Sequence, residues 1–183
     1  LRELPVGRRI SILGPLGNGF PAGIESGATP IMVAGGYGVA PLFFLARTLQ
    51  TRGHLFIGGS NARDILCRSD FEALGWQVHV ATVDGSEGMR GLVTDALDAW
   101  IAKAPPAGMV IYGCGPRGML KAVGERAIAR DCQAWLSLDR HMGCGVGACL
   151  ACVQKVRRDG AVAWARVCKD GPVFEARTIV WDE

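Results

Sequence analysis

The sequence predicts an α/β fold in which a doubly wound sheet of five parallel strands precedes a small C-terminal module rich in cysteine. Between residues 28 and 138, short apolar runs alternate with stretches whose apolar residues recur at helical spacing, as in βαβ units. Glycine-rich turns follow the first and the fourth of these runs. Beyond residue 138 the alternation stops, and four of the 7 cysteines follow.

The first segment, residues 1–27, is rich in glycine and proline and is too short to form a core of its own. Arg9–Leu13 is expected to be a strand. It leads into Gly14–Phe20, whose composition predicts a loop. We therefore interpret this segment as the end of a preceding unit.

Five apolar runs are expected to form the parallel sheet. The connections between them are long enough to hold helices, and such crossovers are right-handed, which gives a doubly wound arrangement. The expected strands are Pro30–Ala34, His54–Gly58, Trp76–Ala81, Met109–Tyr112 and Gln133–Leu138. The expected helices are Leu42–Leu49, Arg63–Ala73, Leu92–Ala102 and Met119–Arg130.

The C-terminal residues carry the signature of a hairpin and of a metal centre. Cys152–Val156 and Val162–Val167 flank a turn at Arg158–Gly160 and predict two antiparallel strands. A unit of this size has little room for an apolar core, and a metal centre is a common way to stabilise one. The expected organisation is the end of a preceding unit with a linker in residues 1–27, an α/β domain in 28–138 and a cysteine-rich module in 139–183.

Composition narrows the function classes. Hydrophobic residues make up 49%, which supports a sizeable core and argues against disorder. The net charge of +3 is small and the basic residues are scattered, so we expect no nucleic acid partner. No apolar run reaches the ~18 residues that span a bilayer, so we expect no membrane insertion. The 7 cysteines without a secretion signal indicate a reducing compartment, the cytoplasm.

Cys144, Cys149, Cys152 and Cys168 carry the strongest chemical signal, with gaps of four, two and fifteen residues between them. The first three match the ligand loop of plant-type [2Fe–2S] clusters, and a distant fourth completes the set because each iron takes two thiolates. A structural zinc site usually pairs two Cys-x-x-Cys knuckles, whereas one is present here. A disulfide framework suits small secreted chains. The spacing favours the iron–sulfur cluster, with zinc or buried thiols as alternatives.

Two glycine-rich loops predict a nucleotide site. Gly35-Gly36-Tyr37-Gly38 follows the first strand and opens a helix, where an α/β sheet binds phosphates on backbone N–H groups. Alone this motif is weak, because a tight strand-to-helix turn has the same composition. Gly113-Cys114-Gly115-Pro116 follows the fourth strand at the same edge of the sheet, and two such loops form a crevice for an extended ligand. Cys114 also has a simpler interpretation as a small buried residue.

Asp84 follows the third strand and can accept hydrogen bonds from a ribose, which favours NAD over a 2′-phosphorylated nucleotide. Asp84-Gly85 is equally typical of a plain turn. We assign no catalytic side chain, because the sequence shows no carboxylate or serine arrangement around any of the 3 histidines. The candidate cofactor-binding residues are Gly35, Gly36, Gly38, Asp84, Gly113, Cys114, Gly115 and Pro116.

The two predicted cofactors differ in the number of electrons that they transfer. A nicotinamide transfers two electrons as a hydride, whereas an iron–sulfur cluster carries one electron at a time. A flavin is the usual device that connects the two kinds of transfer. No complete flavin site is visible in the sequence.

Longer motifs resemble a known family. Gly14–Phe20, Gly35–Pro41 and Tyr112–Pro116 together resemble the ferredoxin-reductase superfamily. Ser137–Cys149 and Arg166–Phe174 are similar to the electron-transfer subunits of type B dihydroorotate dehydrogenases, and the resemblance covers nearly the whole chain. It implies an N-terminal β-barrel that holds FAD, a central domain that binds NAD and a C-terminal [2Fe–2S] module.

The resemblance also implies a partner. In this family an FMN-containing catalytic subunit oxidises dihydroorotate in pyrimidine biosynthesis, and electrons pass from FMN through the cluster and FAD to NAD⁺, typically within a heterotetramer. This sequence departs from the pattern, since the barrel and its FAD-binding Arg-x-x-Ser stretch are absent and residues 1–27 resemble the last strand of the barrel and its exit loop. We expect a shortened chain whose FAD site lies mostly outside it. Asp139 stands where many relatives have Glu, a minor difference.

Two alternatives stay open at this point. Reductase subunits of hydrogenases or of ferredoxin-coupled complexes share this architecture, use NAD(P)H and differ in their partner. A non-catalytic nucleotide-binding module with structural zinc belongs to another class of protein. A zinc protein is colourless, whereas a [2Fe–2S] protein is brown-red, so visible absorbance distinguishes these classes.

Overall fold

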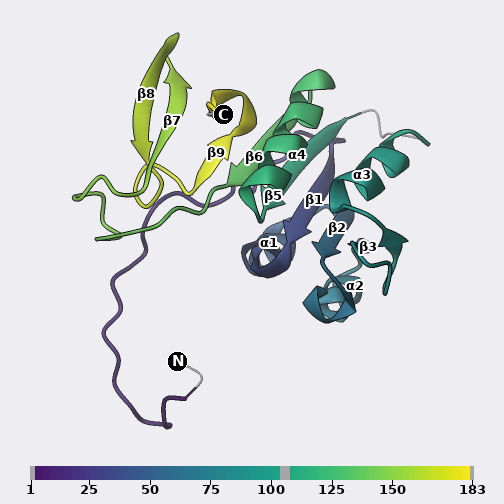
Figure 1. Cartoon of the computed structure of the whole chain (residues 1–183), viewed down its shortest axis with the longest axis horizontal. Helices are drawn as coiled ribbons and strands as arrows, with labels where there is room; N and C mark the ends of the chain where they lie inside the picture. Colours follow the sequence, from purple (N-terminus) through teal and green to yellow (C-terminus); the bar gives the residue numbers. More distant parts are fainter. Residues whose placement is uncertain (1–2, 104–107, 182–183) are drawn as a thin grey trace.

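The computed structural model describes residues 3–103 and 108–181 (Figure 1). Its described strands form a seven-stranded sheet with the order β4-β3-β2-β1-β5-β6-β9 and a two-stranded sheet of β7 and β8. The strands of the large sheet are β1 (Thr29–Gly35), β2 (His54–Gly59), β3 (Gln77–Thr82), β4 (Met89–Arg90), β5 (Met109–Cys114), β6 (Gln133–Ser137) and β9 (Val173–Glu175). The helices are α1 (Val39–Thr48), α2 (Arg68–Ala73), α3 (Val93–Ile101) and α4 (Arg117–Ala129), with the short 3-10 turns η1 (Gly36–Gly38), η2 (Ala62–Asp64) and η3 (Ala176–Thr178).

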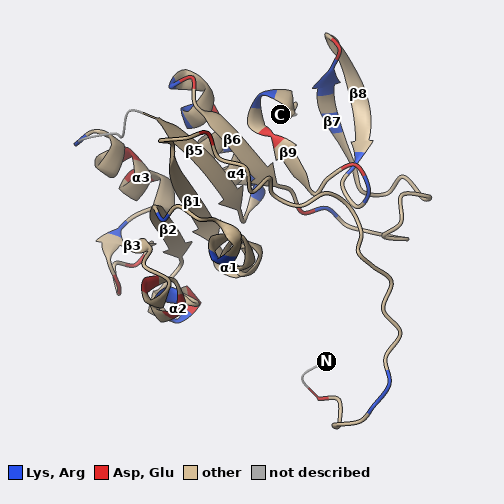
Figure 2. Cartoon of the chain, turned by 180° about the vertical axis from the view of Figure 1, so that it is seen from behind, with Lys and Arg blue, Asp and Glu red and all other residues tan. Residues whose placement is uncertain are grey.

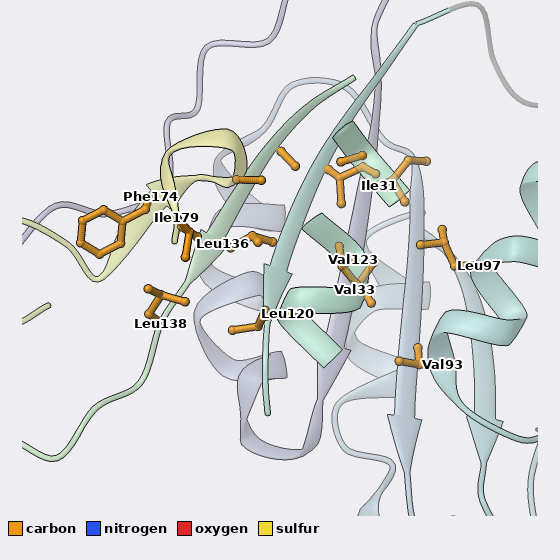
Figure 3. Packing of buried hydrophobic residues seen from close by; sticks show 14 of the residues in the cluster. Ile31, Val33, Val93, Leu97, Leu120, Val123, Leu136, Leu138, Phe174 and Ile179 are labelled. Atoms are coloured by element: carbon orange, nitrogen blue, oxygen red, sulfur yellow. The ribbon is translucent and has the colours of Figure 1, made fainter. Parts of the chain in front are cut away.

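The two faces of β1 pack against different pairs of helices. Ile31 and Val33 lie in one apolar cluster with side chains of α3 and α4 (Figure 3). Met32 and Ala34 lie in a second cluster with side chains of α1 and α2. Because side chains alternate along a strand, a strand covered on both faces is apolar at every position, and β1 reads as an unbroken hydrophobic run. The predicted doubly wound α/β fold is confirmed.

The sheet contains two strands more than the five that the sequence predicts. All five expected runs form strands and pair in parallel. β4 adds two residues beside β3, too few for an alternating pattern to be visible. β9 comes from the C-terminal residues and pairs antiparallel with β6, a contact between distant segments that no local pattern reveals.

The strand expected at Arg9–Leu13 is wrong. No described strand lies beside this segment, so its backbone groups have no ladder to join. Ile12 and Leu13 are 79% and 71% exposed, although their apolar character suggested burial in a sheet.

The helix expected over Arg63–Ala73 is split into η2 and α2. Asp64 accepts hydrogen bonds from the backbone N–H groups of Ser60 and Asn61, which closes the first short turn. Cys67 then takes a left-handed φ of 58°, which a continuous helix does not allow.

Among the described residues, no helix combines the length and the apolar character needed to cross a bilayer.

The predicted C-terminal hairpin is present as β7 (Val153–Arg158) and β8 (Ala161–Arg166), with Asp159 and Gly160 at positive φ in its turn. The hairpin stands apart from the large sheet, and β7 carries basic side chains along its length (Figure 2). Cys152 and Val167 at its base nevertheless belong to the apolar cluster of α3 and α4. The division of the chain after residues 27 and 138 stays a prediction, and the sheet continues past the second boundary through β9.

An aromatic contact attaches the N-terminal segment to the sheet. Phe20 packs edge-on against Tyr112 of β5 with ring centroids 5.7 Å apart, and the Tyr112 hydroxyl donates to the carbonyl of Pro21 at 3.1 Å. Burial raises the pKa of Tyr112 to about 12, so the hydroxyl stays a donor. From this contact the chain runs away from the sheet toward its N-terminus (Figure 1).

Two histidines form a pair on neighbouring strands. His54 Nδ1 of β2 and His79 Nε2 of β3 are 3.0 Å apart, and one ring donates while the other accepts. His79 stacks on Phe56 with a centroid distance of 4.5 Å, and Trp100 lies 4.4 Å from the ring of His54. Burial lowers the pKa of both histidines, and the neighbouring His54 lowers that of His79 further.

The histidine pair predicts a loss of stability on mild acidification. The pKa of both imidazoles is lower in the folded chain than the ordinary value of 6.5, which applies to the unfolded chain. As the pH falls below 6.5, the unfolded state therefore takes up more protons than the folded state and is favoured. We expect a lower midpoint of urea unfolding at about pH 5.5 than at about pH 7.5. The variant that combines His54→Gln with His79→Gln should lose most of this difference, and an equal pH dependence in both proteins would contradict the prediction.

Candidate functional site

The turns after β1 and β5 meet at the carboxyl edge of the sheet. Ala34 and Cys114 are register partners at the ends of these two strands, so η1 and the turn Gly113–Pro116 leave the sheet side by side. Two cavities open on this edge, of about 570 and 520 Å³. Both are lined by Gly35, Gly36, Tyr37 and Pro116, so the two glycine-rich turns form the wall that the cavities share.

Glycine is required where these turns touch. A Cβ at Gly38 would lie 2.0 Å from the carbonyl oxygen of Cys114, and a Cβ at Gly35 would lie 2.6 Å from the ring of Pro116. Any side chain at Gly38 would have to displace the backbone of the turn after β5, which cannot move aside as a flexible side chain could. The sequence motifs therefore serve close packing as well as ligand approach.

The larger cavity has apolar walls, and one cationic and one acidic side chain, Arg63 and Asp64, also line it. Leu66, Val83 and Leu92 come from three different loops and remain 36%, 54% and 58% exposed beside it. Arg63 of η2 lines the same cavity. A flat, apolar group such as a purine would cover these side chains, and a cation nearby suits its attached phosphates. Sequence reasoning missed Arg63, because the continuous helix expected there gave no reason to place it at the sheet edge.

Asp84 lies next to the larger cavity, one residue after the lining residue Val83. Its carboxylate accepts hydrogen bonds from the hydroxyl and the backbone N–H of Ser86. These bonds, the one from the hydroxyl most of all, lower the pKa of Asp84. The Ser86 hydroxyl in turn accepts from the N–H of Ala62 at 2.8 Å. Asp84 thus fixes the loop that carries Arg63.

The smaller cavity lies between the two glycine-rich turns at the carboxyl edge of the sheet and the C-terminal residues. It is lined by Cys114 from β5 and by Asp139, Arg140, Gln154 and Trp181 from the C-terminal segment. Gln154 is buried, and its amide donates to the carbonyls of Lys155 and Val180 while its oxygen accepts from Arg140. Burial raises the pKa of the Cys114 thiol, which therefore stays protonated near neutral pH.

The four predicted ligand cysteines form two pairs. The backbone N–H of Cys144 donates to Cys149 Sγ, and the N–H of Cys149 donates to Cys144 Sγ, both at 3.4 Å. The N–H of Cys168 donates to Cys152 Sγ at 3.4 Å. The first pair is exposed and the second is buried. Cys67, Cys114 and Cys132 lie on other elements.

Backbone donors make Cys144 a good source of thiolate. Hydrogen bonds from the N–H groups of Cys149, Val146 and Ala148 lower the pKa of Cys144 to about 6. The N–H of Cys168 lowers the pKa of Cys152, whereas hydrogen bonding to Cys152 raises that of Cys168.

Within the described residues no three His, Cys, Asp or Glu side chains gather as a site for a single metal ion. Two pairs of sulfur donors suit a centre with two metal atoms, each taking one pair.

Arg166, paired with Asp170, links the two cysteine loops, and no pattern in the sequence indicated this ion pair. Asp170 accepts hydrogen bonds from the backbone and the side chain of Arg166, and Arg166 also donates to the carbonyl of Gly147 at 3.2 Å. Gly147 belongs to the loop of Cys144 and Cys149, whereas Arg166 and Asp170 flank Cys168. Arg166 lowers the pKa of Asp170 to about 2, so the pair stays ionised at ordinary pH.

Comparisons with known protein families agree with both parts of this site. Residues 32–125 match the oxidoreductase NAD-binding domain, and residues 139–180 match the iron–sulfur cluster binding domain of dihydroorotate dehydrogenase B. The chain is 39% identical to the dihydroorotate dehydrogenase B (NAD(+)) electron transfer subunit of Caldanaerobacter subterraneus, over 99% of this chain and 70% of that protein. It belongs to this family of electron-transfer subunits. The resemblance that the sequence motifs suggested is confirmed.

Other members of the family show the same extent of similarity. The electron transfer subunit of Bacillus caldolyticus is 43% identical over 98% of this chain and 68% of its own length. The chain thus spans about two thirds of the curated electron-transfer subunits that it matches. Among solved structures, an NADH-dependent reduced ferredoxin-NADP oxidoreductase has a TM-score of 0.78 and 30% identity, over 94% of this chain and 60% of that one. The likeness to this oxidoreductase supports a ferredoxin-reductase-type α/β fold for the present chain.

The contact between the two turns predicts that Gly38→Ala destabilises the fold. The added Cβ would meet the backbone carbonyl of Cys114, and we expect a loss of about 1–3 kcal/mol in the free energy of unfolding, measured with urea. Gly118→Ala is the matched control, because nothing lies within 4 Å of a Cβ at this helical position. It should leave stability unchanged or raise it by about 0.5–1 kcal/mol. Equal stabilities of the two variants would contradict the prediction.

The Arg166–Asp170 pair predicts that Asp170→Asn loosens the cysteine module. The amide keeps the size of the side chain but removes the charge that attracts Arg166. The midpoint of urea unfolding, followed by amide hydrogen exchange of the β7–β8 hairpin, should therefore fall. Asp159→Asn is the control, since Asp159 sits exposed in the hairpin turn at a φ that Asn adopts equally well. A midpoint that falls equally in both variants would show that the ion pair has no special role.

Proposed function

We propose that this chain transfers electrons between NAD and an FMN-containing dihydroorotate dehydrogenase subunit, through a [2Fe–2S] cluster bound by Cys144, Cys149, Cys152 and Cys168. The observation that carries the proposal is the set of two hydrogen-bonded sulfur pairs in the same chain as a cavity that both glycine-rich turns line together with Arg140 and Gln154 of the cysteine module. In this organisation, residues 28–138 bind the nucleotide and residues 139–183 bind the cluster. The curated relatives are named as electron-transfer subunits of this NAD-linked enzyme.

The sulfur arrangement supports a cluster rather than a single zinc ion. A mononuclear zinc site needs four donors around one point, whereas here the four cysteines fall into two hydrogen-bonded pairs that differ in burial. Backbone N–H groups that already point at sulfur stabilise thiolate, the form that ligates iron. When bound, the cluster supplies one-electron transfer.

The cavities support an extended dinucleotide that lies across the sheet edge. Its pyrophosphate would lie on the shared wall of Gly35, Gly36 and Pro116, at the start of the helices that follow β1 and β5. The adenosine half fits the larger cavity with its apolar walls, and the nicotinamide half fits the smaller one beside Cys114. Asp84 follows the lining residue Val83, and we propose that the carboxylate oxygen not bound to Ser86 accepts from the adenosine ribose. Gly38, Gly113 and Gly115 complete the proposed binding turns.

The two cofactors require a flavin between them, because a hydride carries two electrons and the cluster takes one. We propose FAD in this role, with most of its binding site supplied outside this chain and residues 1–27 leading from it. The enzyme would then act in pyrimidine biosynthesis in the cytoplasm, as a heterotetramer with the FMN-containing subunit.

A second candidate is a reductase subunit that links a nicotinamide nucleotide to ferredoxin. The observation that favours it is the match over 94% of this chain to the NADH-dependent reduced ferredoxin-NADP oxidoreductase. The family match of residues 139–180 to the cluster domain of dihydroorotate dehydrogenase B favours the first proposal. The two candidates share both cofactor sites and differ in the protein that binds the cluster module.

Anaerobic purification with associated proteins tests the proposal. We expect a brown-red complex that contains iron, sulfide, FMN and FAD, and that reduces NAD⁺ when dihydroorotate is added. Zinc without iron or sulfide would refute the cluster. A hydrogenase or ferredoxin-linked partner in place of the FMN-containing subunit would refute the partner and support the second candidate.

Single cysteine substitutions test the ligand set. Cys144→Ser, Cys149→Ser, Cys152→Ser and Cys168→Ser should each lose the visible absorbance, together with iron and sulfide, because serine replaces a thiolate ligand by a weaker oxygen donor. Cys67→Ser, Cys114→Ser and Cys132→Ser are the controls and should keep the full cluster content. Full colour in all four of the first variants would show that the assignment is wrong.

A further inference from the structure

We propose that Asn18 is a positioning residue that holds the loop of Cys168 in place for the cluster, an inference that rests on the ligand set proposed above. Asn18 belongs to the segment before β1 and is separated from Cys168 by almost the whole chain. Neither its motif nor its position in the sequence suggested a role at the metal centre. The contacts below assign it one.

Asn18 makes hydrogen bonds to four consecutive or near-consecutive residues of the loop. Its side-chain Nδ2 donates to the carbonyls of Lys169 at 3.1 Å and Asp170 at 3.2 Å. Its backbone N–H donates to the carbonyl of Gly171, and its carbonyl accepts from the N–H of Val173 at 3.4 Å. One residue therefore satisfies most of the outward-facing backbone groups that follow Cys168.

Gly17 gives an independent sign that this segment is pressed against the loop. A Cβ at Gly17 would lie 2.3 Å from the carbonyl oxygen of Gly171 and 3.0 Å from the ring of Pro172. The backbone of Gly17 also has a φ of +68°, which side chains rarely allow. The approach of the two backbones is thus built into the sequence by a glycine beside the asparagine.

The loop is held from its inner side by other groups. The carbonyl of Arg166 accepts from the N–H groups of Lys169, Asp170 and Gly171, and the N–H of Cys168 donates to Cys152 Sγ. Two sets of contacts therefore hold the loop of Cys168. One is the turn in which the Arg166 carbonyl accepts, and the other is the group of hydrogen bonds made by Asn18, which we call the strap. If the strap is released, the turn at Arg166 alone must fix the distance between Cys168 and Cys152.

The strap also connects the loop of Cys168 to β5, the strand that carries the second glycine-rich turn. Two residues after Asn18, Phe20 packs on Tyr112 of β5, whose strand ends at Cys114 in the smaller cavity. The proposed fourth ligand of the cluster is thus tied through Asn18 and Phe20 to the strand that carries a nucleotide-binding turn. We infer that Asn18 keeps the two redox sites in a fixed relation, so its loss should alter the cluster itself.

The test compares Asn18→Ala with Asn61→Ala in the chain carrying its cluster. Asn61 is the matched control, because it also makes local side-chain hydrogen bonds but lies at η2, away from the cysteines. In Asn18→Ala, loss of visible absorbance under an iron chelator should be about 5- to 30-fold faster than in the unsubstituted chain, and the electron paramagnetic resonance spectrum of the reduced cluster should change. Asn18→Asp, which keeps the size but loses the donor, should behave in the same way.

The outcomes separate this inference from the proposed function. Unchanged chelation rates and spectra in Asn18→Ala, or equal acceleration in Asn61→Ala, would overturn the role of Asn18. If the unsubstituted chain binds no cluster under any reconstitution, the proposed function fails, and amide hydrogen exchange of the metal-free chain then decides about Asn18. Faster exchange at Lys169–Gly171 in Asn18→Ala than in Asn61→Ala would still support the strap, and equal exchange would refute it.

Discussion

The contact between the turns that follow β1 and β5 is the constraint on which the rest of the structure depends. Gly38 lies against the carbonyl of Cys114, so the two strands at the centre of the sheet end at one point and their helices leave in different directions. Both cavities open from this point, and the smaller one extends to the C-terminal residues. The smaller cavity can reach Gln154 and Arg140 of the cysteine module because the central turns occupy so little space.

The sequence was most informative where a local pattern decides the structure. Apolar runs predicted five of the six described parallel strands, all but the two-residue β4, because strands buried on both faces need apolar residues at every position. The turn residues Asp159 and Gly160 predicted the hairpin for the same local reason. β9 could not be predicted, since its pairing with β6 depends on where the cysteine module sits. Arg9–Leu13 misled us because apolar residues suggest a strand even where no partner strand is available.

The site shows the same limit. Spacing identified the four cysteines, but it could not show that they form one exposed and one buried pair, since this depends on how the loops fold back. The ion pair of Arg166 with Asp170 and the strap of Asn18 act across loops, and such residues look like ordinary polar positions in the sequence. Asp84 was predicted near the nucleotide, whereas Arg63 became visible as a lining residue only once η2 was placed.

The pairing of β9 with β6 has a consequence for the life of the chain in the cell. β6 is the last parallel strand, and its outer side stays an open edge until residues 173–175 have left the ribosome and docked. Exposed strand edges recruit other chains and begin aggregation. The segment that closes this edge follows directly on the loop of Cys168, so the folding of that loop and the closure of the edge are linked.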